Sequence, residues 1–286
     1  MEKNLFIDAS HPNETRVVLK SNGNIEDYED PTNSNGVTFS DNDGFYNGDE
    51  TYVGWFWKES VDAGLDIVTY TGNGTDDTDI SHSLSAVPHW IVIKNRDQAS
   101  GYNWRVYHHK NTSAPETDRL NLNDTNATHD DASYWSDEAP TSSVFTLGTD
   151  SSLNGNTDAH VAYLWSEKQG YSKFGSYIGN GSSKNFVHLN FRPAWLLIKR
   201  SSASGTDWIL HDNKRAGFNV NDDYLAANTS AVEVTGNTYQ NLDLLANGFC
   251  LRGSGTGTNT SGETYVYMAF AEQPFVNSKG VPANAR

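Results

Sequence analysis

A chain of 286 residues with 20 Lys plus Arg against 36 Asp plus Glu carries a net charge of −16 at neutral pH. Such a charge repels phosphate backbones and anionic lipid surfaces, so we expect no nucleic-acid partner and no membrane partner. The chain contains eight Trp, 14 Tyr and 12 Phe, and this aromatic content is more typical of β-sheets than of helix bundles. Its single Cys cannot form an intramolecular disulfide, so packing must stabilise the fold. Residues 1–14 have no apolar core of signal-peptide length, so we expect synthesis in the cytoplasm without a secretion signal.

The first 34 residues are polar and contain an acidic run before Pro31. Only residues 16–20, with the sequence RVVLK, have the apolar and β-branched character of a strand. We therefore expect residues 1–34 to form an N-terminal arm or attachment segment, and a solvated tail is the alternative interpretation.

A module made of a short strand, a polar loop and a longer apolar strand begins at residues 35–63 and occurs three times. Its long strands cover residues 51–59, 159–167 and 263–272, and they are apolar at nearly every position, which is typical of central strands. We call this unit a closing module, because its second and third copies end the two repeats described next. The first copy belongs to neither repeat and is therefore surplus. We expect residues 51–59 to form a strand in or against the first repeat, as part of an extra N-terminal strand pair.

Two opening modules repeat each other's landmarks in the same order. The motif YTGNG at residues 70–74 matches YIGNG at 177–181, and PHWIVIK at 88–94 matches PAWLLIK at 193–199. Such self-similarity indicates duplicated structural units, and no segment shows a sustained helical period.

The fold class that we predict is therefore all-β. It consists of two tandem β-sandwich-like repeats, of jelly-roll or lectin-like type, at residues 64–169 and 170–275. Residues 276–286 follow as an irregular C-terminal tail.

Three glutamates, Glu59, Glu167 and Glu272, recur at the ends of the closing strands. An active site is normally single, whereas a structural position repeats with its fold, so we interpret these glutamates as structural. The histidines lack the spacing of a helical zinc site, and no nucleophile elbow, P-loop or dinucleotide fingerprint occurs. We therefore expect no catalytic residue and no cofactor.

A possible metal site begins at Asp41-Asn42-Asp43-Gly44, which resembles the start of a calcium loop. The glutamate that such a loop requires after its glycine is present as Glu50. Asp41, Asp43 and Glu50 are therefore candidate metal ligands. A polar turn between strands explains the same residues, since Phe45 stands where a further oxygen ligand would be expected.

Aromatic side chains are the candidates for ligand binding, because exposed Trp and Tyr present a flat apolar face that stacks on sugar rings. Tyr102, Tyr134 and Trp135 lie in loop-rich stretches of the first repeat, and they are candidates for surface contact, with a core role as the alternative. The repeated pairs, Trp90 with Trp195 and Trp104 with Trp208, are expected in the core.

The modules YTGNG, PHWIVIK, APTSSVF and YVYMAFAEQPF, with the terminal VPANAR, resemble a duplicated domain near the carboxyl end of virion and tail-fibre-like proteins of marine bacteriophages, cyanophages among them. The similarity extends from Asn35 to Arg286. In that family the domain typically ends much larger proteins, whereas here residues 1–34 alone precede the first closing module. A short appendage or a capsid decoration is therefore an alternative to a tail fibre.

The resemblance implies a non-enzymatic structural protein on the virion surface that serves host-surface adhesion. Its partners would be other virion proteins, copies of itself in a symmetric homo-oligomer such as a trimer, and a glycan of the host surface. A carbohydrate-binding module of a bacterial surface protein and a polysaccharide-degrading enzyme are the alternatives.

Overall fold

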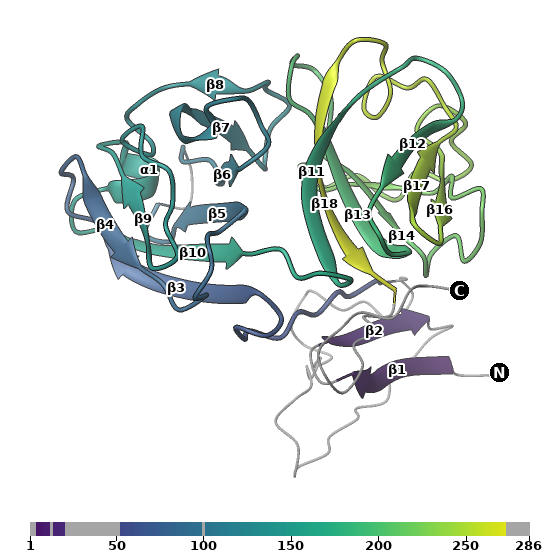
Figure 1. Cartoon of the computed structure of the whole chain (residues 1–286), viewed down its shortest axis with the longest axis horizontal. Coiled ribbons are helices and arrows are strands. Elements are labelled where there is room, and N and C mark those ends of the chain that lie inside the picture. The colour runs from purple at the N-terminus through teal and green to yellow at the C-terminus, as the bar shows by residue number, and fades with distance from the viewer. Residues whose placement is uncertain (1–3, 12–13, 21–51, 99–100, 273–286) are drawn as a thin grey trace. The chain divides into compact units, whose positions relative to one another are not determined.

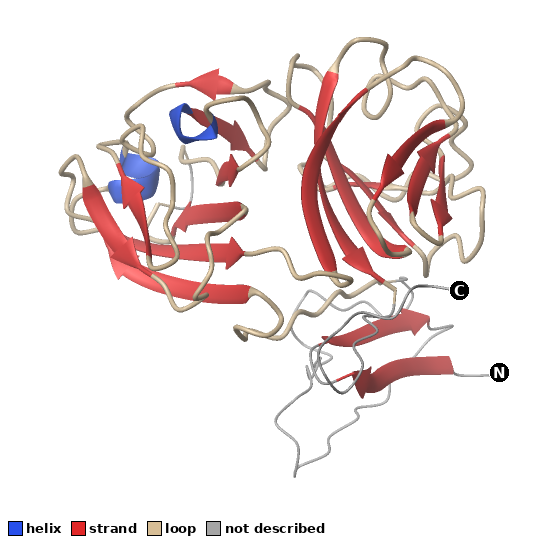
Figure 2. Ribbon diagram, viewed as in Figure 1, coloured by secondary structure: helices blue, strands red, loops and turns tan. Residues whose placement is uncertain are grey.

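The computed structural model describes residues 4–11, 14–20, 52–98 and 101–272. The chain divides into two compact units, residues 1–58 and residues 59–286. The described residues form strands and loops, with only one short helix, α1 (Ser151–Asn154), and one 3-10 turn, η1 (Pro115–Thr117) (Figure 2). The predicted all-β class is confirmed. No helix among these residues is long and apolar enough to cross a membrane.

The N-terminal unit contains a pair of antiparallel strands, β1 (Asn4–His11) and β2 (Glu14–Lys20). The strand predicted at residues 16–20 lies within β2. The prediction that the rest of the arm lacks strands is wrong for β1, whose backbone at residues 4–8 pairs in antiparallel register with residues 16–20 of β2.

Residues 52–59 form no strand, and this corrects the prediction for the surplus closing module. Within this stretch the backbone makes only an isolated bridge at Gly54. The equivalent strand of the first sandwich is β10 (Ala159–Trp165), which pairs with one strand on each side. Composition alone therefore does not make residues 52–59 a strand, because β propensity depends strongly on context.

The first sandwich has a six-stranded sheet in the order β3-β10-β5-β6-β7-β8, which faces the two-stranded sheet β4-β9 (Figure 1). All these pairings are antiparallel. The remaining strands are β3 (Leu65–Thr71), β4 (Thr78–Ser81), β5 (Trp90–Asn95), β6 (Arg105–His108), β7 (Asp118–Asn121), β8 (His129–Asp130) and β9 (Val144–Leu147).

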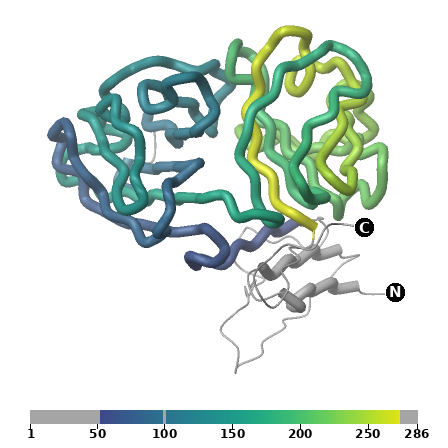
Figure 3. Tube along the Cα trace, in the orientation of Figure 1, coloured from purple at the N-terminus to yellow at the C-terminus, as the bar shows by residue number. Residues whose placement is uncertain are grey.

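The second sandwich has a five-stranded sheet in the order β11-β18-β13-β14-β15 and a three-stranded sheet β12-β17-β16. Figure 3 traces its chain from green to yellow. Its strands are β11 (Ser172–Ile178), β12 (Asn185–His188), β13 (Pro193–Arg200), β14 (Ile209–Asp212), β15 (Leu225–Ala226), β16 (Leu242–Leu245), β17 (Gly248–Leu251) and β18 (Thr264–Ala271).

The two large sheets have corresponding strand orders. In each, the last strand of the sandwich, β10 or β18, lies between the first strand and the strand that begins at the Pro-x-Trp motif. The prediction that the long closing strands are central is confirmed for these two. Trp90 and Trp195 start equivalent strands and are both buried, as expected, with 1% and 8% of their surface exposed.

Each sandwich closes one end with a buried asparagine that binds the Gly-Asn-Gly turn. Asn154 accepts a hydrogen bond from the backbone N–H of Asn73 (2.9 Å), and Asn259 accepts one from the N–H of Asn180 (3.0 Å). Each side-chain amide then donates to two backbone carbonyls. Gly179 lies so close to the carbonyl of Thr260 that a Cβ would stand 2.1 Å from its oxygen, which explains the glycine.

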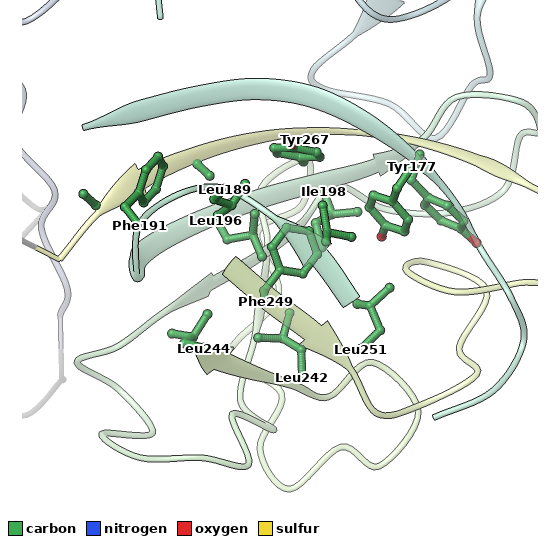
Figure 4. Packing of buried hydrophobic residues seen from close by; sticks show 14 residues of the cluster. Tyr177, Leu189, Phe191, Leu196, Ile198, Leu242, Leu244, Phe249, Leu251 and Tyr267 are labelled. Carbon is green, nitrogen blue, oxygen red and sulfur yellow. The ribbon is translucent and has the colours of Figure 1, made fainter. Parts of the chain in front are cut away.

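The core of each sandwich lies between its two sheets. In the second sandwich, side chains of the five-stranded sheet such as Tyr267 and Ile198 meet Leu242, Leu244 and Phe249 from the three-stranded sheet (Figure 4). The first sandwich has an equivalent core around β5, β9 and β10. Alternation along these strands leaves the other face of each large sheet available for other contacts.

Candidate functional site

The outer face of the six-stranded sheet carries aromatic residues that are not part of the core. Along β10, Ala162 and Leu164 point into the core, so Tyr163 and Trp165 lie on the opposite face. Both side chains are half-buried. Trp104, which precedes β6, joins them on this face through a ring contact with Tyr163.

These three residues, Trp104, Tyr163 and Trp165, form what we call the aromatic stripe. The ring centroids of Trp104 and Tyr163 are 6.4 Å apart with planes inclined by 23°, and those of Tyr163 and Trp165 are 6.3 Å apart with planes inclined by 21°. The planes of neighbouring rings are therefore nearly parallel. Ile67 pairs opposite Tyr163 on β3 and is 38% exposed, so the apolar surface continues toward the sheet edge.

The equivalent face of the second sandwich is closed. Met268 and Phe174 pair across strands and occupy the positions that Tyr163 and Ile67 occupy in the first sandwich. Trp208 corresponds to Trp104. The backbone N–H of each donates to an asparagine side chain, that of Asn228 or Asn123 respectively. Met268, Phe174 and Trp208 are all buried. The first sandwich helps to cover them, because Trp90 contacts the rings of Phe174 and Trp208.

The outer face of the first sandwich is also buried where it meets the second, at Trp90 and His108, but the aromatic stripe on this face stays partly exposed. A flat ligand with an apolar face could stack there, and hydroxyl groups at its rim would stay in water. The stripe consists of ring faces rather than of paired acids and bases, so its chemistry is that of binding.

Tyr102, a predicted binding residue, lies close to one end of this face. It is half-buried, and its backbone carbonyl accepts a hydrogen bond of 2.9 Å from Nζ of Lys94. Lys94 pairs with Val161 on the same sheet, and burial lowers the pKa of its ammonium group. Tyr102 is two residues from Trp104, so its backbone lies beside the candidate site.

The expectation that Tyr134 and Trp135 make surface contacts is wrong, because both are buried in the first core, at 4% and 1% exposure. The indole Nε1 of Trp135 donates to the carbonyl of Asp118 (2.9 Å). The ring of Tyr134 packs against the guanidinium groups of Arg105 and Arg119, 4.8 and 4.6 Å from its centroid. The surrounding loop folds over the sheet and fills the sandwich, although its sequence is polar.

The candidate metal ligands Asp41, Asp43 and Glu50 lie outside the described residues. Within residues 52–98 and 101–272 no group of three or more His, Cys, Asp or Glu side chains is arranged to hold a metal ion.

The three recurring glutamates each have a structural partner. Glu59 Oε1 accepts a hydrogen bond from the backbone N–H of Ile67 (3.2 Å), and Glu167 Oε1 accepts one from the N–H of Phe174 (2.8 Å). In both contacts the glutamate binds the edge strand that follows it in the chain. Glu272 instead forms an ion pair with Arg192, with 3.2 Å between Oε2 and Nε. These contacts fit the structural interpretation of the repeated positions.

Sequence reasoning did not find the cluster of His89, His108 and His109, which we call the histidine junction. The ring centroids of His89 and His109 are 4.4 Å apart, and those of His108 and His109 are 5.6 Å apart. The signal was present: the second repeat has Ala194 where the first has His89, and the His-His doublet has no counterpart. A search for metal-ligand spacing could not show that these residues meet the second sandwich.

The described residues thus define an all-β protein with two sandwiches, an aromatic stripe on one sheet and a histidine junction between the sandwiches. The chain belongs to the family described as a domain of unknown function (DUF7483), which matches residues 3–274. No curated protein and no solved structure matches the chain.

Proposed function

We propose that this protein is a non-enzymatic structural component of a bacteriophage virion, in a tail fibre, an appendage or a capsid decoration, and that it serves adhesion to the host surface. The resemblance of its repeated motifs to phage virion proteins supports the virion assignment. The observation that carries the adhesive role is the aromatic stripe, whose residues are partly exposed, whereas the equivalent residues of the second sandwich are buried.

A host-surface glycan is the ligand that this site fits best. Sugar rings have an apolar C–H face and a polar rim, and the nearly parallel rings of Trp104, Tyr163 and Trp165 match the apolar face. The net charge of −16 disfavours strongly anionic polymers, so a neutral or weakly charged glycan is the preferred class. A carbohydrate-binding module of a bacterial surface protein would use the same site, and only the location of the protein separates the two assignments.

Replacing Trp104 or Tyr163 with Ala is expected to weaken binding to host cell-envelope polysaccharide about tenfold, which corresponds to losing about 1.4 kcal/mol of stacking. Binding is measured by calorimetry or on immobilised polysaccharide. Phe218→Ala is the matched control, since Phe218 is an exposed aromatic residue of the second sandwich at 77% exposure. Equal affinity of the stripe variants and the wild type would remove the stripe from the adhesive role.

We also expect no hydrolysis of such polysaccharides, because the recurring glutamates bind backbone and Arg groups within the fold. Incubation with host polysaccharide and measurement of reducing ends checks this. Reproducible release that is abolished by an acid-to-amide substitution, such as Glu167→Gln, would favour the polysaccharide-degrading alternative.

Labelling of purified phage particles with an antibody against the protein, viewed by electron microscopy, tests the virion assignment. Label at the tail or on the capsid would support it and would distinguish these positions. A protein confined to the bacterial surface would contradict it.

A further inference from the structure

The histidine junction lies where the first sandwich meets the second. His108 ends β6 and His109 follows it, while His89 precedes β5. Across the boundary, Nε2 of His109 is 2.6 Å from the carbonyl oxygen of Phe174 on β11, and Nε2 of His108 is 3.2 Å from that of Tyr267 on β18. Two histidines of one sandwich thus bond directly to the backbone of the other.

These contacts determine which nitrogen of each ring carries the proton. A carbonyl oxygen only accepts, so Nε2 of His108 and of His109 must be the N–H donor. Nδ1 of His108 accepts from the backbone N–H of Lys110 (3.0 Å), and Nδ1 of His89 accepts from the N–H of Glu167 (3.1 Å). A second proton on either Nδ1 would point at an N–H group, so protonation breaks that contact.

Among the described residues, the charged groups around the junction do not supply a dedicated counter-ion to each ring. Glu167 is the nearby carboxylate, with Oε1 3.9 Å from Nε2 of His109, and the same oxygen is bonded by the N–H of Phe174. Burial is the main reason that the pKa values of His89 and His109 are lowered, and the positive charge of Lys110 lowers both further. From the second sandwich the groups bonded to the rings are the backbone carbonyls of Phe174 and Tyr267, which do not titrate, and the phenol of Tyr267 packs in the core of that sandwich.

Other contacts across this boundary do not titrate in mild acid. The indole Nε1 of Trp208 donates to the carbonyl of Asn121 (2.8 Å), and the backbone N–H of Thr128 donates to the carbonyl of Ser201 (2.9 Å). Nζ of Lys199 donates to the carbonyl of Thr125 (3.2 Å), and its ammonium stays charged below its pKa of about 8. The histidines are therefore the acid-sensitive part of these contacts.

We propose that the histidine junction is an acid-sensitive latch: its neutral rings hold the two sandwiches together, and their protonation separates the sandwiches while each stays folded. The proposal concerns a conformational response of the chain and does not depend on the adhesive function.

The pH range follows from the protonation of the closed and open forms. Burial lowers the pKa of His108 to about 3 and that of His109 to about 4, and it also lowers the pKa of His89. In the open form each ring regains water and a pKa of about 6.5. The open form therefore binds more protons below about pH 6.5, and the closed form is favoured above it. Each such histidine shifts the equilibrium toward the open form about tenfold for each pH unit below that value.

Small-angle X-ray scattering of the full chain between about pH 7.5 and about pH 4.5, together with far-ultraviolet circular dichroism, tests the latch. We expect the radius of gyration to increase between about pH 6 and about pH 4.5 while the β signal is retained. Loss of the β signal together with the expansion would mean global unfolding and would overturn the proposal, as would an unchanged radius over the whole range.

Variants separate the junction from other acid effects. The triple variant His89→Gln, His108→Gln and His109→Gln keeps amide donors but takes up no proton, so it should stay compact at about pH 4.5. If it fails to fold, the single variant His109→Gln should make the transition about tenfold less steep per pH unit. His211→Gln is the matched control, because His211 is buried within the second sandwich with a pKa of about 4. A control that abolishes the expansion, or a junction variant that leaves it unchanged, would contradict the latch.

Discussion

Replacing Trp208 with Ala is expected to lower the free energy of unfolding by about 3–5 kcal/mol, the range found for emptying a large core site. Its side chain has 0% exposure, its ring lies 5.8 Å from that of Trp90, and its indole N–H bonds the carbonyl of Asn121. Alanine removes the packing of both sandwiches on this ring and leaves the buried carbonyl without its donor. Chemical denaturation followed by circular dichroism measures the change.

Trp104→Ala is the matched control, because Trp104 occupies the equivalent position of the first sandwich and is half-buried. Trp104→Ala should lower the free energy of unfolding by clearly less than Trp208→Ala, because less of the Trp104 surface is buried on folding. Equal losses for the two variants would show that the two outer faces are covered to the same extent, which would also remove the basis for a binding site on the stripe.

Replacing Asn259 with Ala is expected to cost about 3 kcal/mol, because three backbone groups, one of them at the buried Gly253, lose their side-chain partner. Its amide donates to the carbonyls of Ser182 (2.8 Å) and Gly253 (2.9 Å), and its Oδ1 accepts from the backbone N–H of Asn180. Asn259 and Gly253 are buried, so the carbonyl of Gly253 in particular loses a donor that water does not readily replace. The effect is measured as a loss of free energy of unfolding in urea.

Asn259→Asp provides a nearly isosteric test of the same prediction. The carboxylate keeps the acceptor for Asn180 but cannot donate to the two carbonyls, and it places a charge in a buried site. We expect it to be at least as destabilising as the alanine variant at neutral pH. Asn237→Ala, at a half-buried turn whose side chain caps two backbone N–H groups, should cost less. An Asn259→Asp variant as stable as the wild type would argue against donation by this amide to the carbonyls of Ser182 and Gly253.

The parts of the fold that follow from local patterns were predictable from the sequence. The uniform apolarity of residues 159–165 indicated a central strand, and the Pro-x-Trp motifs placed Trp90 and Trp195 at buried strand starts. The repeated glutamates were recognised as structural because they recur. These signals lie either within one segment of about ten residues, where side-chain period and composition are informative, or in the comparison of repeated segments.

Features that depend on distant segments were not predictable. Residues 52–59 have the composition of a strand but form none, and strand formation depends on pairing with distant segments that composition does not show. Tyr134 and Trp135 lie in a polar loop and still fill a core. The aromatic stripe was missed because its residues come from different segments, and because the repeat suggested the same burial for both copies.

The position of β10 and β18 has a consequence for how the chain is made. Each is the last strand of its sandwich to leave the ribosome, and each lies between two strands that were synthesised well before it. The earlier strands therefore have unpaired edges until the final strand inserts between them. Each large sheet is completed by non-local pairing, which is intrinsically slow. A chain interrupted before Ala159 would hold β3 and β5 without the strand that joins them. Such nascent chains are exposed to edge-to-edge association, so timely completion of each sandwich protects the protein from aggregation during synthesis.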